Sequence, residues 1–166
     1  FIVGAVVSSS LIDGRYHRNK KPLYAIPLLF VTALLGLTAL LGEMGVFGEF
    51  GGPREDTPHF LMLSILSFAM GMQNAAVATS TGLVVRTTHL TGPATDFGVN
   101  LVIAWTDSGE VRKHALQSAA LRGGKIIAFI MGAACMLFVA REYRYAAFMM
   151  PSFFVFLATL LSFIPQ

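Results

Sequence analysis

Charged residues are scarce in this chain of 166 residues. Asp, Glu, Lys and Arg together make up 13% of it and hydrophobic residues 55%, whereas a soluble domain carries about 25% charged residues. The mean hydropathy is +0.67. The composition therefore predicts an integral membrane protein whose main surroundings are the lipid bilayer.

Cysteine pairs and common catalytic motifs are missing as well. The one cysteine, Cys135, has no second cysteine to pair with, which excludes a disulfide framework and a cysteine metal site. The four histidines are scattered, and there is no phosphate-binding glycine loop or serine-hydrolase motif. The charges lie between apolar runs rather than on one face, so nucleic acid is not an expected partner. We expect no enzyme activity, no metal and no cofactor.

Long apolar runs are what the sequence has in place of charge. A helix that crosses the ~30 Å hydrocarbon layer needs about 20 apolar residues. Four runs reach this length, and each predicts a complete transmembrane helix: residues 23–42, 60–79, 119–140 and 145–165. Residues 1–12 are apolar but too short to span, and we interpret them as the end of an earlier span. The expected fold class is an all-α polytopic transmembrane helix bundle, with residues 1–166 in one membrane domain.

The loops between these runs differ in charge. Residues 13–22 carry four basic residues against one aspartate, whereas residues 43–59 carry four acidic residues against Arg54 alone. The positive-inside rule places the first loop in the cytoplasm and the second outside. Following the spans from there, the loop after the second span and the C-terminus are expected on the cytoplasmic side.

Residues 93–105, within that inner loop, are predicted to form a helix. Thr91 or the glycine after it can cap this helix, Pro93 suits its first position, and Asp96 then lies in the first turn, where the helix dipole favours an anion. Asn100 shares a face with Asp96 at i, i+4 spacing. Because another face is apolar, we expect the helix to lie at the cytoplasmic interface or to re-enter the protein.

The run over residues 60–79 contains small and polar residues within an apolar helix. Four small residues recur at every fourth position and predict close packing against another helix: Ser67, Gly71, Ala75 and Thr79. Gln73 and Asn74 lie at or beside this contact. They can hold helices together by hydrogen bonds, or they can line a polar pathway.

The segment after this run is rich in hydroxyl groups. Residues 59–85 exceed the length of one span, so the helix tilts, ends with the span, or breaks near residues 80–82. Arg86 can anchor a helix end or pair with Asp96, and His89 can relay protons or brace a loop. The candidate residues for a substrate path are Gln73, Asn74, Arg86, Thr87, Thr88, His89, Thr91, Asp96 and Asn100.

Two motifs in this region resemble a known family. The sequence Gly-Met-Gln-Asn-Ala at residues 71–75 is followed by Val-Arg-Thr-Thr-His-Leu-Thr-Gly-Pro-Ala-Thr-Asp at residues 85–96. The pair resembles the YoaK family of multi-pass bacterial inner-membrane proteins, which is classed as a domain of unknown function. Pro93 and Ala94 depart from the Thr-Leu pair that is usual in the family, which removes one hydroxyl group.

The resemblance implies a protein of about six spans, of which this chain holds the C-terminal part. In that family the first span resembles the fourth, so the two copies cross the membrane in opposite directions, as in the inverted repeats of many secondary transporters. We therefore expect a permease-like transporter of a small polar or cationic solute.

Two alternatives stay open. The first is a non-transporting membrane scaffold or assembly protein whose polar residues hold helices together, and a homo-oligomer is compatible with either role. The second is a membrane enzyme that acts on a lipid, with His89 and Asp96 as acid and base.

Overall fold

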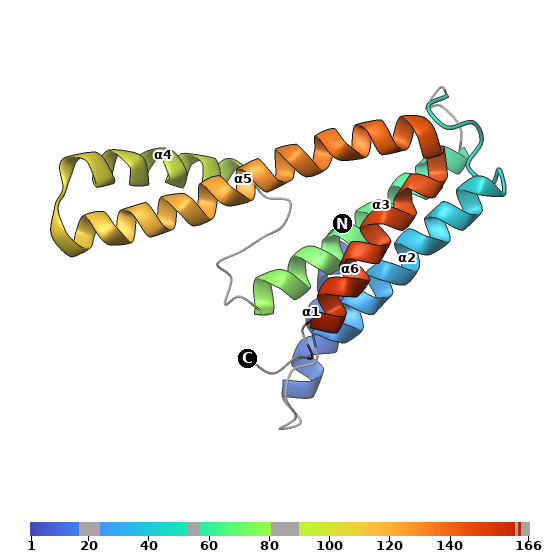
Figure 1. The fold of residues 1–166 in the computed structure, drawn as a ribbon. Helices are drawn as coiled ribbons and strands as arrows, with labels where there is room; N and C mark the ends of the chain where they lie inside the picture. Colours follow the sequence, from blue (N-terminus) through green and yellow to red (C-terminus); the bar gives the residue numbers. More distant parts are fainter. Residues whose placement is uncertain (17–23, 53–56, 81–89, 162, 164–166) are drawn as a thin grey trace. The chain divides into compact units, whose positions relative to one another are not determined.

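The computed structural model describes residues 1–16, 24–52, 57–80, 90–161 and 163. Every element within these ranges is helical, which confirms the expected fold class. The order, shown in Figure 1, is α1 (Ile2–Tyr16), α2 (Ala25–Glu43), α3 (Thr57–Ser80), α4 (Thr91–Thr106), α5 (Gly109–Tyr143), the 3-10 helix η1 (Arg144–Phe148) and α6 (Met149–Leu161).

The contacts within the chain divide it into two compact units. Unit 1 comprises residues 1–87 and 139–166, and unit 2 comprises residues 88–138. Helix α5 begins in unit 2, and its last residues belong to unit 1. The single membrane domain expected from the sequence stays a prediction.

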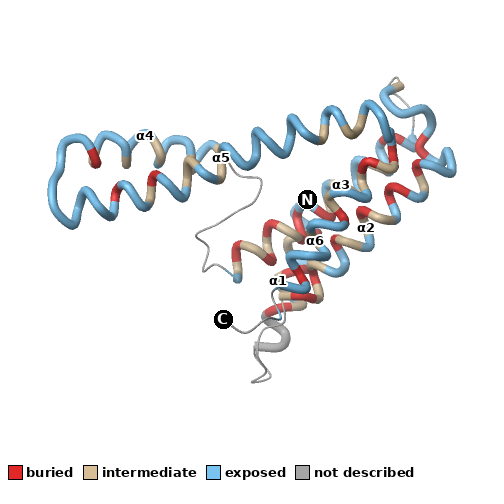
Figure 2. The backbone as a smooth tube through the Cα atoms, viewed as in Figure 1, coloured by how far each residue is buried: buried red, intermediate tan, exposed pale blue. Residues whose placement is uncertain are grey.

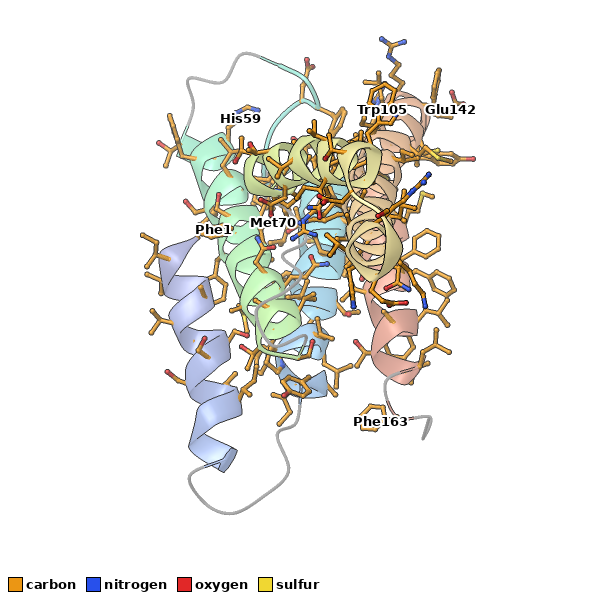
Figure 3. The ribbon with its side chains drawn as sticks, turned by 90° about the vertical axis from the view of Figure 1, so that its left-hand side faces the viewer. Phe1, His59, Met70, Trp105, Glu142 and Phe163 are labelled. Atoms are coloured by element: carbon orange, nitrogen blue, oxygen red, sulfur yellow. The ribbon has the colours of Figure 1, made fainter. Side chains whose placement is uncertain are left out.

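In unit 1, α3 packs mainly against α1 and α2, and α6 packs on the other side of α2. Figures 1 and 3 show α1, α3 and α6 running in one direction and α2 in the other. The core contains Val31 and Leu35 of α2 and Ala69 and Met72 of α3, and Figure 2 shows buried positions along these helices. The alternating directions of α1, α2 and α3 are those of consecutive membrane spans.

Three helical stretches in the described chain are long and apolar enough to cross a membrane: α2, α3 and the run from α5 through η1 to α6. The last expected span, residues 145–165, corresponds to η1 and α6, because Arg144 interrupts the helix with a φ of 48°. Helices α3 and α6 run in the same direction and begin at the same end of unit 1.

The contact between α1 and α3 is so close that it requires glycine. A Cβ atom on Gly71 would collide with the carbonyl oxygen of Phe1, and a Cβ atom on Gly4 would collide with the carbonyl oxygen of Phe68. Two helix backbones approach this closely only where no side chain separates them. Helix α1 is therefore the partner of the small-residue face of α3.

Unit 2 is a hairpin of α4 and the first part of α5. Its buried residues are alanines, Ala104 on α4 with Ala115 and Ala119 on α5. The ring of Phe97 lies against Gly123. The chain turns between the helices at Gly109, whose φ of +64° suits a residue without a Cβ atom.

Helix α4 starts earlier than the sequence predicts. Its N-cap is Leu90, which makes no capping hydrogen bond through its side chain, so the predicted cap at Thr91 or Gly92 is wrong. The first turn contains no acidic residue, so Asp96 lies beyond the range of the helix dipole. Pro93 is compatible with this earlier start, because the N–H groups of a first helical turn have no intrahelical partner.

Candidate functional site

The candidate residues on α3 lie beside its contact with α1. Gly71 forms the contact, Asn74 is buried with 8% of its surface exposed, and Gln73 is half-buried. The other small residues of the stripe are less enclosed. Ala75 and Thr79 are half-buried, and Ser67 is exposed. A buried amide in an apolar helix requires hydrogen-bonding partners from protein or water.

Four candidate residues lie outside the described ranges: Arg86, Thr87, Thr88 and His89. The expected helix break near residues 80–82 falls mostly on the same segment, because α3 ends at Ser80. The hydroxyl group of Ser80 donates to the carbonyl of Val77 at 3.0 Å. The pairing of Arg86 with Asp96 and the acid–base role of His89 stay predictions.

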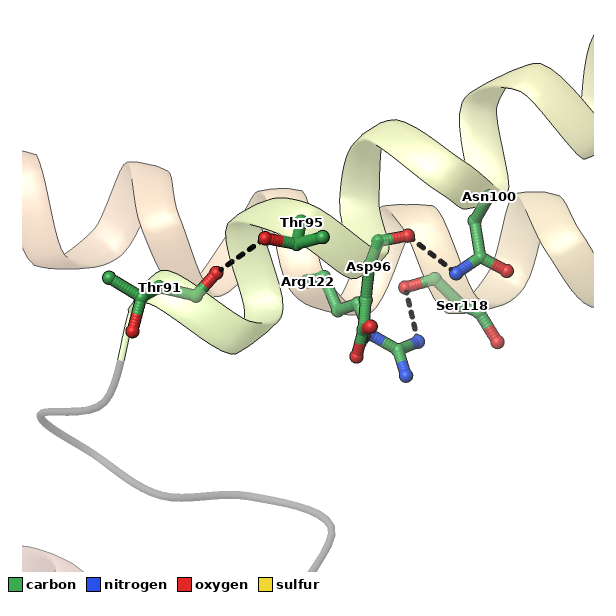
Figure 4. A network of polar contacts seen from close by, with 6 residues as sticks. All are labelled: Thr91, Thr95, Asp96, Asn100, Ser118 and Arg122. Carbon is green, nitrogen blue, oxygen red and sulfur yellow. Dashed lines mark hydrogen bonds and ion pairs between the residues drawn. The ribbon is translucent and has the colours of Figure 1, made fainter.

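The remaining candidates lie on α4 in unit 2, as Figure 4 shows. Nε of Arg122 on α5 donates to Oδ2 of Asp96 at 3.2 Å. The side-chain amide of Asn100 donates to the backbone carbonyl of Asp96 at 2.6 Å, as their i, i+4 spacing favours. The backbone carbonyl of Thr91 accepts a hydrogen bond from the hydroxyl group of Thr95 at 3.1 Å.

Arg122 is a partner of Asp96 that the sequence did not reveal. The two residues are 26 positions apart and meet because α4 and α5 form a hairpin. The side chains of Arg122 and Asp96 are 31% and 54% exposed, so the pair contributes about 0–1 kcal/mol to stability. A turn signal at Gly109 between two helical segments was the one hint in the sequence.

The candidate residues that the structure describes are thus divided between the two units. Gln73 and Asn74 belong to unit 1, whereas Thr91, Asp96 and Asn100 belong to unit 2. A single polar route through both groups stays a prediction.

A polar pocket that the sequence did not predict lies at one end of unit 1. Its volume is about 410 Å³, and we call it the end pocket. Its described lining residues are Gly42, Glu43, Gly48, Glu49, Phe50, Arg144 and Tyr145. In the sequence, the acidic residues of this region indicate only the orientation of the chain in the membrane.

The end pocket is held in shape by Tyr145, which is 5% exposed. Its ring packs so closely on α2 that a Cβ atom on Gly42 would collide with it. Its hydroxyl group donates to the carbonyl of Phe47 at 3.3 Å, and Phe50 meets its ring edge to face with centroids 5.0 Å apart. Oε1 of Glu43 accepts the backbone N–H of Ala146 at 3.0 Å. These contacts tie α2, the following turn and η1 together.

The turn beside the pocket could have been noticed in the sequence. Gly45, Gly48 and Gly51 recur at every third position, and their φ values are +78°, +76° and +81°. Glycines at such regular spacing indicate a defined turn rather than an unstructured linker. Within the described ranges, no group of three or more His, Cys, Asp or Glu residues could hold a metal ion.

Comparison with known proteins places the chain in a family without assigning an activity. No curated protein and no solved structure matches it. The family model described as protein of unknown function (DUF1275) matches residues 1–161. The match agrees with the resemblance of residues 71–75 and 85–96 to the YoaK family, which is a DUF1275 family. The chain therefore belongs to the DUF1275 family of proteins of unknown function.

Proposed function

We propose that this protein is a permease-like transporter of a small polar or cationic solute in the bacterial inner membrane. The observation that carries the proposal is the buried amide of Asn74 beside half-buried Gln73, on a helix apolar enough to cross the membrane. Polar groups at that depth usually face the interior of the bundle or a water-filled path. A solute in such a path replaces its hydrogen bonds to water with hydrogen bonds to these amides.

The charges of the loops support one orientation of the helices across the membrane. Helix α2 runs from the basic segment of residues 13–22 to the acidic segment of residues 43–59, and α3 runs back. By the positive-inside rule the end pocket then faces the outside of the cell. We expect a cytoplasmic C-terminus, and the shared direction of α6 and α3 supports this expectation.

The preference for a solute that is not purely anionic rests on the end pocket. Two carboxylates, on Glu43 and Glu49, line it together with one guanidinium, on Arg144. Asp96 does not contribute to this preference, because its charge is balanced by Arg122 and it lies beyond the first turn of α4.

The alternative is a non-transporting scaffold, and the close contact between α1 and α3 favours it. Gln73 and Asn74 lie beside Gly71, so they can hydrogen-bond between helices and stabilise assembly. In membranes such hydrogen bonds contribute about 0.6 kcal/mol each on average.

Uptake measurements with matched variants separate the two functions. The purified protein is reconstituted into vesicles, and uptake of a panel of radiolabelled amino acids, amines and sugars is measured. The variants are Asn74→Leu and Ser67→Leu; Ser67 is an exposed residue of the same helix. We expect uptake of at least one solute, unchanged in Ser67→Leu and about tenfold slower in Asn74→Leu, since a lost polar contact of about 1.4 kcal/mol has that effect.

The same samples test the scaffold. Absence of uptake by the wild-type protein across the panel, with a changed oligomeric state or lower melting temperature in Asn74→Leu, would overturn the transporter and support the scaffold. If Asn74→Leu fails to fold, the half-buried Gln73→Leu replaces it. Uptake by folded Gln73→Leu equal to that of Ser67→Leu would then contradict a polar path along α3.

A further inference from the structure

We infer that the end pocket binds a small zwitterion, a solute with an ammonium group and an anionic group separated by a short apolar chain. The inference rests on the proposed function in one respect, because it names the class of solute that the transporter takes up. The binding itself requires only the pocket.

The size and construction of the pocket are those of a small-molecule site. Its volume of about 410 Å³ lies in the range of roughly 300–1,000 Å³ that is usual for such sites. Its walls come from the end of α2, the turn that follows it and the junction of α5 with η1. All of these segments belong to unit 1.

The lining carries charges of both signs that do not neutralise one another directly. Within the described ranges, no ion pair joins Glu43 or Glu49 to Arg144, and the two ion pairs found there involve other side chains. The two carboxylates would repel a purely anionic solute, and a purely cationic one would leave the guanidinium of Arg144 without a counter-ion. A zwitterion can satisfy both, through charge-assisted hydrogen bonds at each end.

The position of Glu43 is set by the structure. Its Oε1 atom accepts the N–H of Ala146 at 3.0 Å, which orients the carboxylate and leaves its second oxygen for a ligand. Glu49 follows on the neighbouring turn, next to Gly48, whose φ of +76° shapes that turn. The two carboxylates thus reach the pocket from different segments.

Arg144 adopts a backbone conformation that few residues with a side chain adopt, with a φ of 48°. It is the first residue of η1, at the end of α5, and lines the pocket. Such strain persists only where surrounding structure enforces it, and it is concentrated at functional sites. Between the charged groups, the rings of Tyr145 and Phe50 form an apolar wall for a short methylene chain.

The first test compares solutes of matched size. Isothermal titration calorimetry on the detergent-purified protein at neutral pH uses γ-aminobutyrate, butylamine and butyrate, which share a carbon chain but are zwitterionic, cationic and anionic. We expect γ-aminobutyrate to bind at least about tenfold more tightly than either of the others, equivalent to about 1.4 kcal/mol. Equal or tighter binding of butylamine or butyrate, or no binding by a series of ω-amino acids from glycine to γ-aminobutyrate, overturns the inference.

The second test compares variants. Glu43→Gln and Glu49→Gln remove one charge each, and glutamine at residue 43 still offers an acceptor to the N–H of Ala146. Arg144→Asn removes the guanidinium and retains a residue that tolerates positive φ. The controls are Glu142→Gln and Arg141→Gln, which change exposed residues beside the pocket that do not line it.

We expect each pocket variant to lose at least about tenfold in affinity for the zwitterion, an amount typical of one charge-assisted contact, and each control to keep its affinity. Melting temperatures identify any variant that is not folded. Equal affinities of folded pocket variants and controls overturn the inference.

Uptake assays on the same variants separate the two proposals. If zwitterion binding is lost in Glu49→Gln while uptake stays at the wild-type rate, the binding site and the proposed transporter both stand, but the inference that this site sets the class of transported solute fails. If the zwitterion binds as expected but no solute is taken up by the wild-type protein, the transporter fails and the assigned binding site stands.

Discussion

The α1–α3 contact of unit 1 and the α4–α5 contact of unit 2 both depend on small residues, but they are built differently. In unit 1, Gly4 and Gly71 bring helix backbones together with no room for a methyl group. In unit 2, Gly98 on α4 has open space where a Cβ atom would lie, and the polar link between the helices is a partly exposed ion pair. A glycine in an apolar helix therefore indicates close packing only where a second helix lies opposite it.

The largest expected effect is the loss of stability in Gly71→Ala. The added methyl group would collide with the carbonyl oxygen of Phe1, and overpacking of this kind costs about 1–3 kcal/mol or more. The measurement is thermal or denaturant unfolding in detergent, followed by helix content.

Gly98→Ala is the matched control in unit 2. Because nothing lies within 4 Å of its Cβ position, alanine should raise stability by about 0.5–1 kcal/mol through its higher helix propensity. Two substitutions of the same kind should therefore have opposite signs. If both substitutions destabilise the protein, or if neither does, the difference between the two helix contacts described above is wrong.

A smaller loss is expected for Gly42→Ala at the end pocket. Here the methyl group meets the Cβ atom and the proximal ring atoms of Tyr145 rather than a backbone carbonyl, so one side chain has to shift and not a whole helix. We expect a loss of about 1–2 kcal/mol, which Tyr145→Leu in the same chain should partly restore. A double-mutant cycle measures this coupling, and a coupling of zero would show that the two residues do not meet.

The ion pair of unit 2 should contribute least among the polar contacts. Asp96→Asn and Arg122→Gln are each expected to change stability by less than about 1 kcal/mol, because both side chains are partly exposed. Their coupling should decrease as salt is added. A coupling above about 2 kcal/mol, insensitive to salt, would show that this pair is buried in the membrane-embedded protein.

The smallest effect on stability is expected for Trp105→Ala, within about 0.5 kcal/mol, since the side chain is 91% exposed. Trp105 is the one tryptophan of the chain, so its fluorescence reports on unit 2 alone. If α4 lies at the membrane interface, brominated lipids should quench it more strongly than aqueous iodide. The reverse order would place α4 away from the bilayer.

The central spans could be predicted from the sequence because hydropathy alone determines them. The runs at residues 23–42 and 60–79 match α2 and α3 within a few residues at each end. The first part of α5 was missed because it is a polar helix that continues outside the apolar window. Glu110 and Lys113, which pair there at 3.9 Å, support the helix by i, i+3 contact and leave no hydropathy signal.

The candidate site was predictable only where its residues share one helix. The spacing of Asp96 and Asn100 predicted their shared face, and the hydrogen bond between them lies within α4. Arg122 could not be assigned to Asp96 in this way, because periodicity within a helix says nothing about the register of a helical hairpin.

The sequence by itself determined that this chain is a bundle of membrane helices, since charge is scarce and its apolar runs have the length that a helical span requires. It also marked Gly71 and Asn74 as unusual for a lipid-facing helix. Only the tertiary structure decided that α1 is the partner of Gly71 and that Glu43, Glu49 and Arg144 line one pocket. The reason is physical: the glutamates and the arginine are separated by most of the chain, and they meet only because α6 and η1 pack back against α2.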